Sequence, residues 1–476
     1  MRATGAADGA GRRAARAAAP LRVVVLGAGL AGACAAAAAA GHGRIVTLVE
    51  RDELPDAPRP RPGVPQGRLL HVYLHRGLLA IEELLPGFRA ELEAAGAVAL
   101  DTGDLAWLGE FGWAPTGRPQ LPLLSASRPL VEHVVLRRVR ALPGVVVRDG
   151  TRVAGLRRGG PGGPAWWVDP AEGAPLPADL VVDATGRSSR LPAWLAAAGV
   201  APAATSEVDA HLGYAARRYA LDGARVAVPG VVVLQTPRDP SGGIALPVEG
   251  GEWLVGATGA GGVRPPRDPA GFDAFLEGLR HDAVARLARA GRPVGDVVVH
   301  RQTGNRRHHY ERVRGWPAGL LVLGDALCAF NPVYGQGVTV AACEALVLRR
   351  ALARGWRPGQ ERRLLRRFVR VAALPWAIAT SSDLRYASAE GTPTRVQAAL
   401  GRWTQELDRL ASHGDALASA TVARVYHLVG SPLLLVRPGL LVAALRARRH
   451  GYGPALPAPH VVAGPDEIRA ARGSDR

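Results

Sequence analysis

The segment that most constrains the fold is "LRVVVLGAGLAGACAAAAAA", residues 21–40. Its β-branched residues predict a strand, its Gly-x-Gly-x-x-Gly centre predicts a tight turn, and its alanines predict a helix. The segment "RIVTLVE" then predicts a second strand that ends at Glu50. This strand-loop-helix-strand order predicts a Rossmann-like fold, in which helices cover a mostly parallel sheet.

The glycine loop also predicts a dinucleotide site, formed by Gly27, Gly29, Leu30, Ala31 and Gly32. Gly27 permits the tight turn, Gly29 lets the backbone approach a pyrophosphate, and Gly32 allows the helix to pack closely. The helix N-terminus then offers free N–H groups and its positive dipole end to the phosphates. Glu50 follows at the spacing where a carboxylate accepts from ribose hydroxyls. The pattern alone does not distinguish NAD from FAD.

Two further strands end in polar, glycine-rich turns. "ADLVVDATGRSSR" contains Asp183, Gly186 and Arg187, and "GLLVLGDA" ends in Gly324 and Asp325. Because open α/β sheets bind ligands at the carboxyl ends of their strands, we expect all three turns to meet. A nicotinamide dehydrogenase would not need the third turn, whereas the ribityl hydroxyls of FAD need an acceptor such as Asp325. FAD is therefore the predicted cofactor.

The next segment, "FNPVYGQG", predicts contact with the flavin ring through Pro332, Gly335, Gln336 and Gly337. We expect it to begin a helix that runs through residues 338–350, since proline is tolerated at a helix start. Its glycines would leave backbone N–H groups bare against a planar ring. A helix N-terminus at this point would stabilise the negative charge of a reduced flavin.

These three motifs, in this order and spacing, resemble those of single-component flavoprotein monooxygenases related to para-hydroxybenzoate hydroxylase and squalene epoxidase. The segments "RPGVPQGRLLH", "SRPLVE", "NRRHHYERVRGWPAGLLVLGDA" and "FNPVYGQG" are similar to those of bacterial polyether epoxidases of lasalocid and monensin biosynthesis. The resemblance implies further FAD contacts from Arg51 near the adenosine, Arg128 at the ribityl chain or pyrophosphate, and Asp183 and Arg187. One departure is Leu69, which stands where relatives carry the first histidine of a His-x-His pair, so that only His71 remains.

The predicted architecture is α/β, with a Rossmann-like FAD-binding domain, an inserted antiparallel β-sheet substrate domain and C-terminal helices. The expected segments are a disordered leader (1–20), the FAD-binding domain (21–97, 125–205 and 301–350), the substrate domain (98–124 and 206–300) and the helical region (351–476). The aromatic residues expected to line an apolar substrate cavity are Trp107, Trp113, Tyr214, Tyr219 and Trp253.

Composition excludes several other classes. The formal net charge is +18, but every basic residue is arginine and the arginines are scattered, so we expect no nucleic-acid groove. The three cysteines form no CxxC pair, which predicts reduced thiols and a cytoplasmic protein. The longest apolar runs fall short of the ~20 residues that span a bilayer. We expect no membrane span and no metal site.

The predicted function is that of an FAD-dependent monooxygenase acting on an apolar polyketide or isoprenoid. Reduced flavin and O2 give a C4a-hydroperoxide, and an alkene takes its distal oxygen without a protein base, so epoxidation is favoured and no catalytic side chain is expected. Aromatic hydroxylation, reduction of isoprenoid double bonds and a non-enzymatic, FAD-stabilised partner remain alternatives. No WxWxIP-like segment favours halogenation, and His308 and His309 are expected to be structural.

The chain has no second strand-GxGxxG-helix unit for the electron donor. We therefore expect NAD(P)H to dock transiently near Arg187 and the "PRPGVPQGR" loop. A separate flavin reductase is the alternative.

Overall fold

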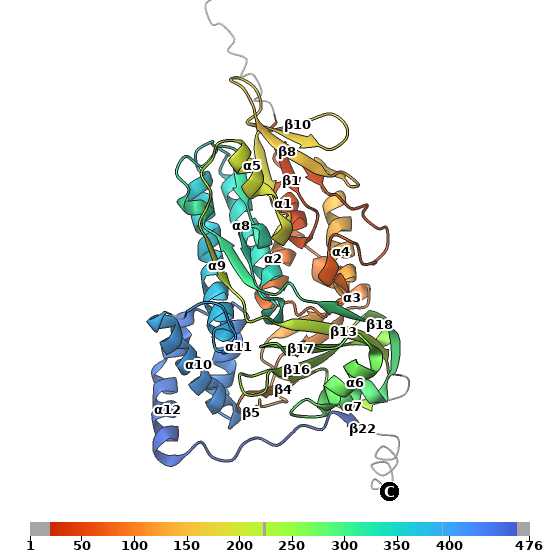
Figure 1. The fold of residues 1–476 in the computed structure, drawn as a ribbon, viewed down its shortest axis with the longest axis vertical. Helices are drawn as coiled ribbons and strands as arrows, with labels where there is room; N and C mark the ends of the chain where they lie inside the picture. The colour runs from red at the N-terminus through yellow and green to blue at the C-terminus, as the bar shows by residue number, and fades with distance from the viewer. Residues whose placement is uncertain (1–19, 222–224, 393, 464–476) are drawn as a thin grey trace, which may run out of the picture.

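The structure is a computed structural model that describes residues 20–221, 225–392 and 394–463. Most of the predicted leader lies outside these residues. The described chain has an α/β part at the top of Figure 1, an antiparallel sheet at the lower right and a helical part at the lower left. The predicted fold class is confirmed, while the domain boundaries remain predictions.

The α/β part is built on a parallel sheet of five strands. Their order is β20 (Leu320–Val322), β11 (Leu180–Asp183), β1 (Arg22–Leu26), β2 (Ile45–Val49) and β7 (Val145–Arg148). Strands β1, β11 and β20 are almost wholly apolar and buried, as expected where both faces of a parallel sheet are covered.

Helices and a small antiparallel sheet cover this parallel sheet. The helices are α1 (Leu30–Ala39), α2 (His75–Leu84), α3 (Phe88–Ala94), α4 (Arg128–Arg140), α5 (Leu191–Ala197) and α8 (Gly337–Ala353). The small sheet contains β8 (Val153–Arg158), β9 (Trp166–Pro170) and β10 (Leu176–Ala178). Trp166 on β9 is fully buried in the main core, so the small sheet belongs to the same folding unit.

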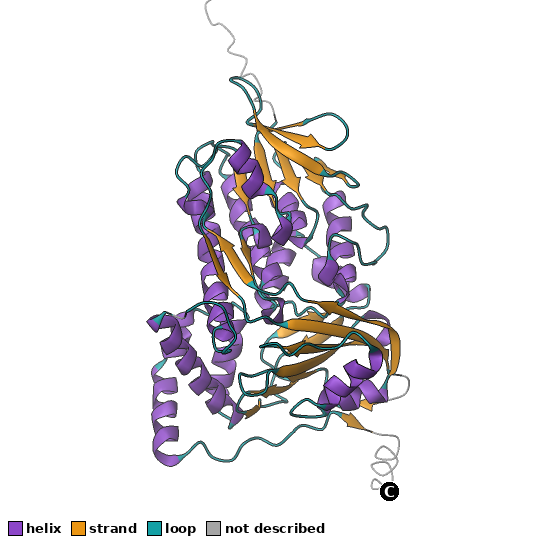
Figure 2. Ribbon diagram, in the orientation of Figure 1, coloured by secondary structure: helices purple, strands orange, loops and turns teal. Residues whose placement is uncertain are grey.

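The inserted sheet has seven strands. Their order is β18 (Arg292–His300), β13 (Gly213–Ala220), β17 (Glu252–Gly259), β16 (Ser241–Pro247), β15 (Val231–Val233), β4 (Ala106–Gly109) and β5 (Gly112–Trp113). All pairs are antiparallel except β15 with β4, which comes from a remote segment of the chain. Figure 2 shows α6 (Pro269–Glu277) and α7 (Ala283–Ala290) on one side of this sheet.

Three of the five predicted cavity residues lie on that helix-covered side. Trp113, Tyr219 and Trp253 are buried in a core shared with α6 and α7. Side chains alternate along a strand, so Tyr219 points away from the face that Tyr214 occupies. Trp253 is the cross-strand partner of Tyr219 and shares its face. These three side chains therefore face α6 and α7, and their place in a substrate cavity remains a prediction.

Short strands connect the two sheets. They form the pairs β3 (Val98–Asp101) with β6 (Pro122–Ser125), and β19 (Asn305–His308) with β12 (Thr205–Val208) and β21 (Cys328–Ala329). His309, just after β19, bonds Ser206 through its ring, in agreement with a structural role.

Helix α9 (Glu361–Asp383) lies beside α8 and packs into the core of the α/β part (Figure 1). The helical part contains α10 (Arg395–Ser412), α11 (Ala416–Tyr426), the 3₁₀ helix η7 (Pro432–Val436) and α12 (Pro438–His450). The chain then crosses the base of the molecule to β22 (Val462–Ala463), which pairs with β14 (Arg225–Val226) (Figure 1). Within the described residues, no helix has the length and apolar character needed to cross a bilayer.

Candidate functional site

The three glycine-rich turns meet at one edge of the parallel sheet, because β1, β11 and β20 are neighbours. A Cβ atom on Gly27 would lie 2.8 Å from the carbonyl oxygen of Ala184, in the turn after β11. A Cβ atom on Gly324 would lie 2.8 Å from Cβ of Ala31. Both glycines also have positive φ angles, +88° and +64°. The predicted convergence of the turns is confirmed.

The glycine loop is tight on one side and open on the other. A Cβ atom on Gly32 would lie 1.7 Å from the carbonyl oxygen of Gly27, so that position accepts no side chain. A Cβ atom on Gly29 would have one neighbour within 4 Å, Nη2 of Arg61 at 3.9 Å. No described side chain caps α1 at Gly29. The free N–H groups of its first turn therefore suit a phosphate.

Glu50 holds this loop in place. Its Oε2 accepts from the N–H of Ala28 at 2.7 Å, and its Oε1 accepts from the N–H of Asp52 at 3.1 Å. Nη1 of Arg61 lies 3.1 Å from Oε2. A carboxylate offers about four lone-pair sites, so roughly one is left for a ribose hydroxyl.

Arg61 is a site residue that sequence reasoning did not single out. Its side chain is buried, donates to the carbonyl oxygen of Ala28 at 3.1 Å and reaches Glu132 on α4 at 3.3 Å. It thus joins the glycine loop to α4. Its place in the glycine- and proline-rich segment after Glu50 was the available signal.

Asp325 borders open space deep in the molecule. Desolvation raises the pKa of its carboxyl group, yet 34% of the side chain is exposed. Nε of Arg187 lies 4.0 Å from Oδ2 of Asp325, and the charges of Arg187 and Arg128 oppose the rise in pKa. Arg128 itself donates to Glu132 at 2.7 Å. The site therefore offers one accessible carboxylate flanked by arginines.

The segment after Asp325 presents bare backbone as predicted, but the helix begins later. Pro332 opens a separate 3₁₀ turn, η6 (Pro332–Tyr334), and α8 begins at Gly337. The helix cannot start at Pro332 because Gly335 has a φ angle of +63°. Pro332 is exposed, whereas Gln336 is fully buried and its amide N and O atoms find no hydrogen-bond partner among the described residues. The unpaired amide of Gln336, beside the uncapped N-terminus of α8, suits the polar edge of a flavin ring.

The comparison with known sequences now decides the family. Protein Rv3254 of Mycobacterium tuberculosis is 34% identical over 346 residues, which cover 69% of this chain and 72% of that protein. The chain belongs to the family of Protein Rv3254. No protein-family model matches the sequence.

Solved structures show the same fold as this Rv3254-family chain. The flavin-dependent brominase Bmp2 superposes with a TM-score of 0.61 at 14% identity, covering 90% of this chain and 98% of Bmp2. The oxygenase of 2-methyl-3-hydroxypyridine-5-carboxylic acid gives a TM-score of 0.52 at 19% identity, covering 86% of this chain and 97% of that structure. At these identities the similarity establishes the fold alone.

Two residues of the Rv3254-family chain that were predicted to contact FAD, Asp183 and Arg51, have other side chains as neighbours. Asp183 is fully buried and accepts from the hydroxyl groups of Thr185 at 2.6 Å and Ser189 at 2.5 Å. It shapes the turn that contains Gly186. Arg51 is largely exposed and lies 3.9 Å from its neighbour Asp52. Their roles toward FAD remain predictions.

A buried polar network lies behind η6 and was missed by sequence reasoning. Asp383, the last residue of α9, accepts from the hydroxyl of Tyr334 at 2.6 Å and from the amides of Asn305 at 2.6 Å and Asn331 at 3.1 Å. Tyr214 donates to Oδ1 of Asn331 at 3.0 Å. Desolvation raises the pKa of Asp383 to about 6. The network fastens the predicted ring-binding segment to the inserted sheet and to α9.

His71 and Leu69 occupy different environments. Nδ1 of His71 hydrogen-bonds the carbonyl oxygen of Leu69 at 3.0 Å, and desolvation and the charge of Arg128 lower the pKa of His71 to about 3. Leu69 is buried against Ala216 and Leu254 of the inserted sheet. Leu69 thus packs the loop after Arg68 onto the inserted sheet. Trp107, another residue expected to line the substrate cavity, is half-buried on β4. It lies on the opposite face of this strand from Leu108, which packs toward α6 and α7.

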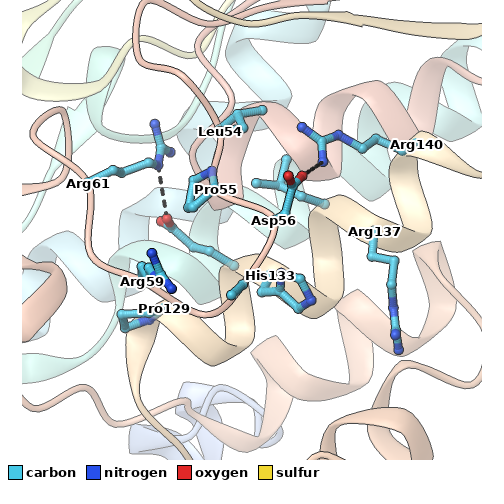
Figure 3. Close-up of a pocket in the computed structure, with 12 residues that line it drawn as sticks. Leu54, Pro55, Asp56, Arg59, Arg61, Pro129, His133, Arg137 and Arg140 are labelled. Carbon is cyan, nitrogen blue, oxygen red and sulfur yellow. Dashed lines mark hydrogen bonds and ion pairs between the residues drawn. The ribbon is translucent and has the colours of Figure 1, made fainter.

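A cavity of about 220 Å³ lies on the outer side of Arg61 (Figure 3). The loop after β2 and α4 form its walls, with four arginines, Arg59, Arg61, Arg137 and Arg140. Figure 3 shows the ion pair between Arg140 and Asp56 at its rim, 4.0 Å long. Arg61 joins the cavity wall to the glycine loop through its bond to Ala28, and the lining carries an excess of positive charge.

Proposed function

We propose that the protein binds FAD without a covalent link and is a monooxygenase for an apolar natural product. The observation that carries the proposal is the meeting of the open glycine loop, the accessible Asp325 and the bare start of α8 at one sheet edge. These features are suited to a pyrophosphate, a ribityl chain and a flavin ring, in that order. The fold shared with flavin-dependent enzymes supports the same conclusion.

The chain's own residues would bind and orient the cofactor. The N–H groups of Leu30, Ala31 and Gly32 would receive the pyrophosphate, and Asp325 would accept from ribityl hydroxyls. The N–H groups at Gln336 and Gly337, with the positive end of α8, would stabilise negative charge on the ring. Once reduced, FAD supplies the chemistry of O2 activation.

Epoxidation of an alkene is the reaction that the site favours. A phenol requires a general base to raise its nucleophilicity, and an efficient base has a pKa near the working pH. His71 has its pKa held at about 3, so it is a weak base, and Asp325 is flanked by arginines. An alkene needs no base. We therefore propose a polyketide or isoprenoid alkene as the substrate, in keeping with the resemblance to polyether epoxidases.

We propose NAD(P)H as the electron donor, docked transiently against the loop that contains Arg61. The arginine-lined cavity beside this loop suits the phosphates of a dinucleotide. A separate flavin reductase is the competing source of electrons. Anaerobic stopped-flow mixing with NADPH and NADH distinguishes the two, since flavin that is reduced only after a reductase is added contradicts direct docking.

The decisive experiment identifies cofactor and product together. The purified protein is expected to be yellow and to release intact FAD on denaturation. Supplied with NADPH, ¹⁸O2 and isoprenoid or polyene alkenes, it is expected to form epoxides that carry ¹⁸O. Saturated products formed without O2 would instead indicate a double-bond reductase. A protein that holds FAD but consumes no NAD(P)H, with or without a reductase, would not be an enzyme of this kind.

A further inference from the structure

The helical part exposes an apolar surface that the described residues leave uncovered. Nine large apolar residues are strongly exposed in the described chain, and six of them lie between residues 417 and 445: Leu417, Leu433, Val436, Leu441, Val442 and Leu445. Three belong to one short stretch of α12, where Leu441, Val442 and Leu445 are each at least 50% exposed. We call these six residues the apolar ridge.

Positive charge predominates around the apolar ridge, although Asp415 caps α11 two residues before Leu417. Residues 416–465 contain five arginines and no aspartate or glutamate. Arg437, Arg446, Arg448 and Arg449 are exposed at the two ends of α12. Arg448 has a carboxylate partner in Glu406, but that bond is 3.6 Å long and two thirds of the arginine side chain is exposed. An apolar stripe flanked by arginines is the pattern that binds the interface of anionic bilayers.

The fold keeps both ends of the described chain away from the apolar ridge. In Figure 1, α12 lies along the lower left edge of the molecule. The described chain begins beside β10 at the top and ends after β22 at the lower right. A second copy of the chain is a poor occupant, because a two-fold contact through this face would bring the same arginines together.

We propose that the apolar ridge and its arginines dock the protein on an anionic membrane surface, with α12 lying in the headgroup region. Docking would not require a spanning helix. Two neighbouring structural features connect this surface to the candidate site. The hydroxyl of Tyr426 on α11 donates to the carbonyl oxygen of Tyr334 at 3.1 Å, and the carbonyl oxygen of His427 accepts from the N–H of Arg76 at 3.3 Å.

The proposal does not depend on the monooxygenase reaction, and its test needs no turnover. The full-length protein, with any cofactor it holds, is mixed with vesicles of phosphatidylglycerol or of phosphatidylcholine, and bound protein is measured by flotation. Binding is expected to phosphatidylglycerol, to weaken in high salt and to be at least ~10-fold weaker for phosphatidylcholine.

Matched variants distinguish binding through the apolar ridge from nonspecific binding through other exposed apolar residues. The triple variant Leu441→Ser, Val442→Ser, Leu445→Ser is expected to lower the partition coefficient by ~10-fold or more. Ile45→Ser and Val146→Ser, exposed apolar positions of the parallel sheet, are the controls and should bind like the parent. Changing Arg446, Arg448 and Arg449 to glutamine should abolish the preference for the anionic lipid, whereas the exposed Arg118, Arg267 and Arg354 changed likewise should leave it intact.

Circular dichroism of each variant confirms that it is folded, so that a loss of binding reports on the surface. Equal binding by the ridge variant and its controls would overturn the proposal. Failure of the parent protein to bind either kind of vesicle would also overturn the proposal. A self-association that the ridge variant abolishes, in the absence of vesicle binding, would assign the face to a second copy instead.

Discussion

At the scale of single residues, the candidate site depends on a few groups that hold one another through buried polar contacts. Glu50 and Arg61 hold each other, and Asp383 holds three donors. Asp325 is the exception, since its ion-pair partner lies 4.0 Å away and a third of its surface is open. It is therefore the residue whose removal should affect a ligand more than the fold.

Asp325→Ala is expected to weaken FAD binding by roughly 10- to 100-fold, since a hydrogen bond to a charged group contributes about 1.5–3 kcal/mol. The dissociation constant is measured by titrating the apoprotein with FAD and following flavin fluorescence. Asp169→Ala is the control, because Asp169 pairs with Arg157 on an exposed hairpin. An unchanged affinity in the Asp325 variant would remove this residue from the cofactor site.

Tyr334→Phe is expected to lower the free energy of unfolding by about 1.5–3 kcal/mol, because the buried Asp383 carboxylate loses one of its donors. Urea unfolding followed by circular dichroism measures the change. Tyr310→Phe is a matched control, since the buried hydroxyl of Tyr310 has no partner among the described residues. Equal effects of the two variants would show that the Asp383 network contributes no stability.

Sequence patterns predicted the residues whose roles are local. Gly27 and Gly324 could be assigned because each follows a strand in a tight turn, and Gly32 because it completes the Gly-x-Gly-x-x-Gly pattern at the start of α1. Asp383 could not, since α9 brings it to Asn331 from 52 residues away. The side to which Tyr219 points could not be predicted for a similar reason, because the face of a strand that meets helices depends on segments far along the chain.

At the scale of elements, substitutions in the glycine loop and α1 can distinguish an effect on FAD binding from an effect on stability. Gly29→Val should leave the free energy of unfolding nearly unchanged, because only an arginine end lies near the added carbons, and should abolish FAD retention by filling the open side of the loop. Gly32→Ala should unfold or strongly destabilise the protein, since its Cβ would overlap the Gly27 carbonyl oxygen. Thermal unfolding and FAD content are measured for both. Full FAD content in a folded Gly29→Val protein would place the pyrophosphate elsewhere.

At the scale of the whole molecule, we expect acid to weaken the junction between the helical part and α2. Nδ1 of the buried His427 accepts from the N–H of His75 at 3.2 Å, and desolvation lowers the pKa of His427 to about 4. The folded state therefore binds fewer protons than the unfolded state between pH 4 and about 6.5. The stability that neutral His427 provides is complete above that window and is lost as the pH falls through it.

His427→Gln keeps an acceptor but does not titrate. From pH 7.5 to pH 5, the parent protein is expected to lose ~2 kcal/mol more unfolding free energy than this variant does. Urea unfolding at the two pH values gives the comparison. Parallel losses in parent and variant would show that another group causes the acid sensitivity.

The three turns of the candidate site come from distant parts of the chain, and so do the contacts around them: Nη1 of Arg44 donates to the carbonyl oxygen of Leu352, 308 residues further on. During synthesis the glycine loop leaves the ribosome long before β20 and α8 exist. Its alanine-rich helix must then wait without the partner that buries it. High contact order of this kind slows folding and prolongs the exposure of apolar surface. The proposed dinucleotide site is thus completed only after β20 and α8 have been synthesised, although the glycine loop comes first in the sequence.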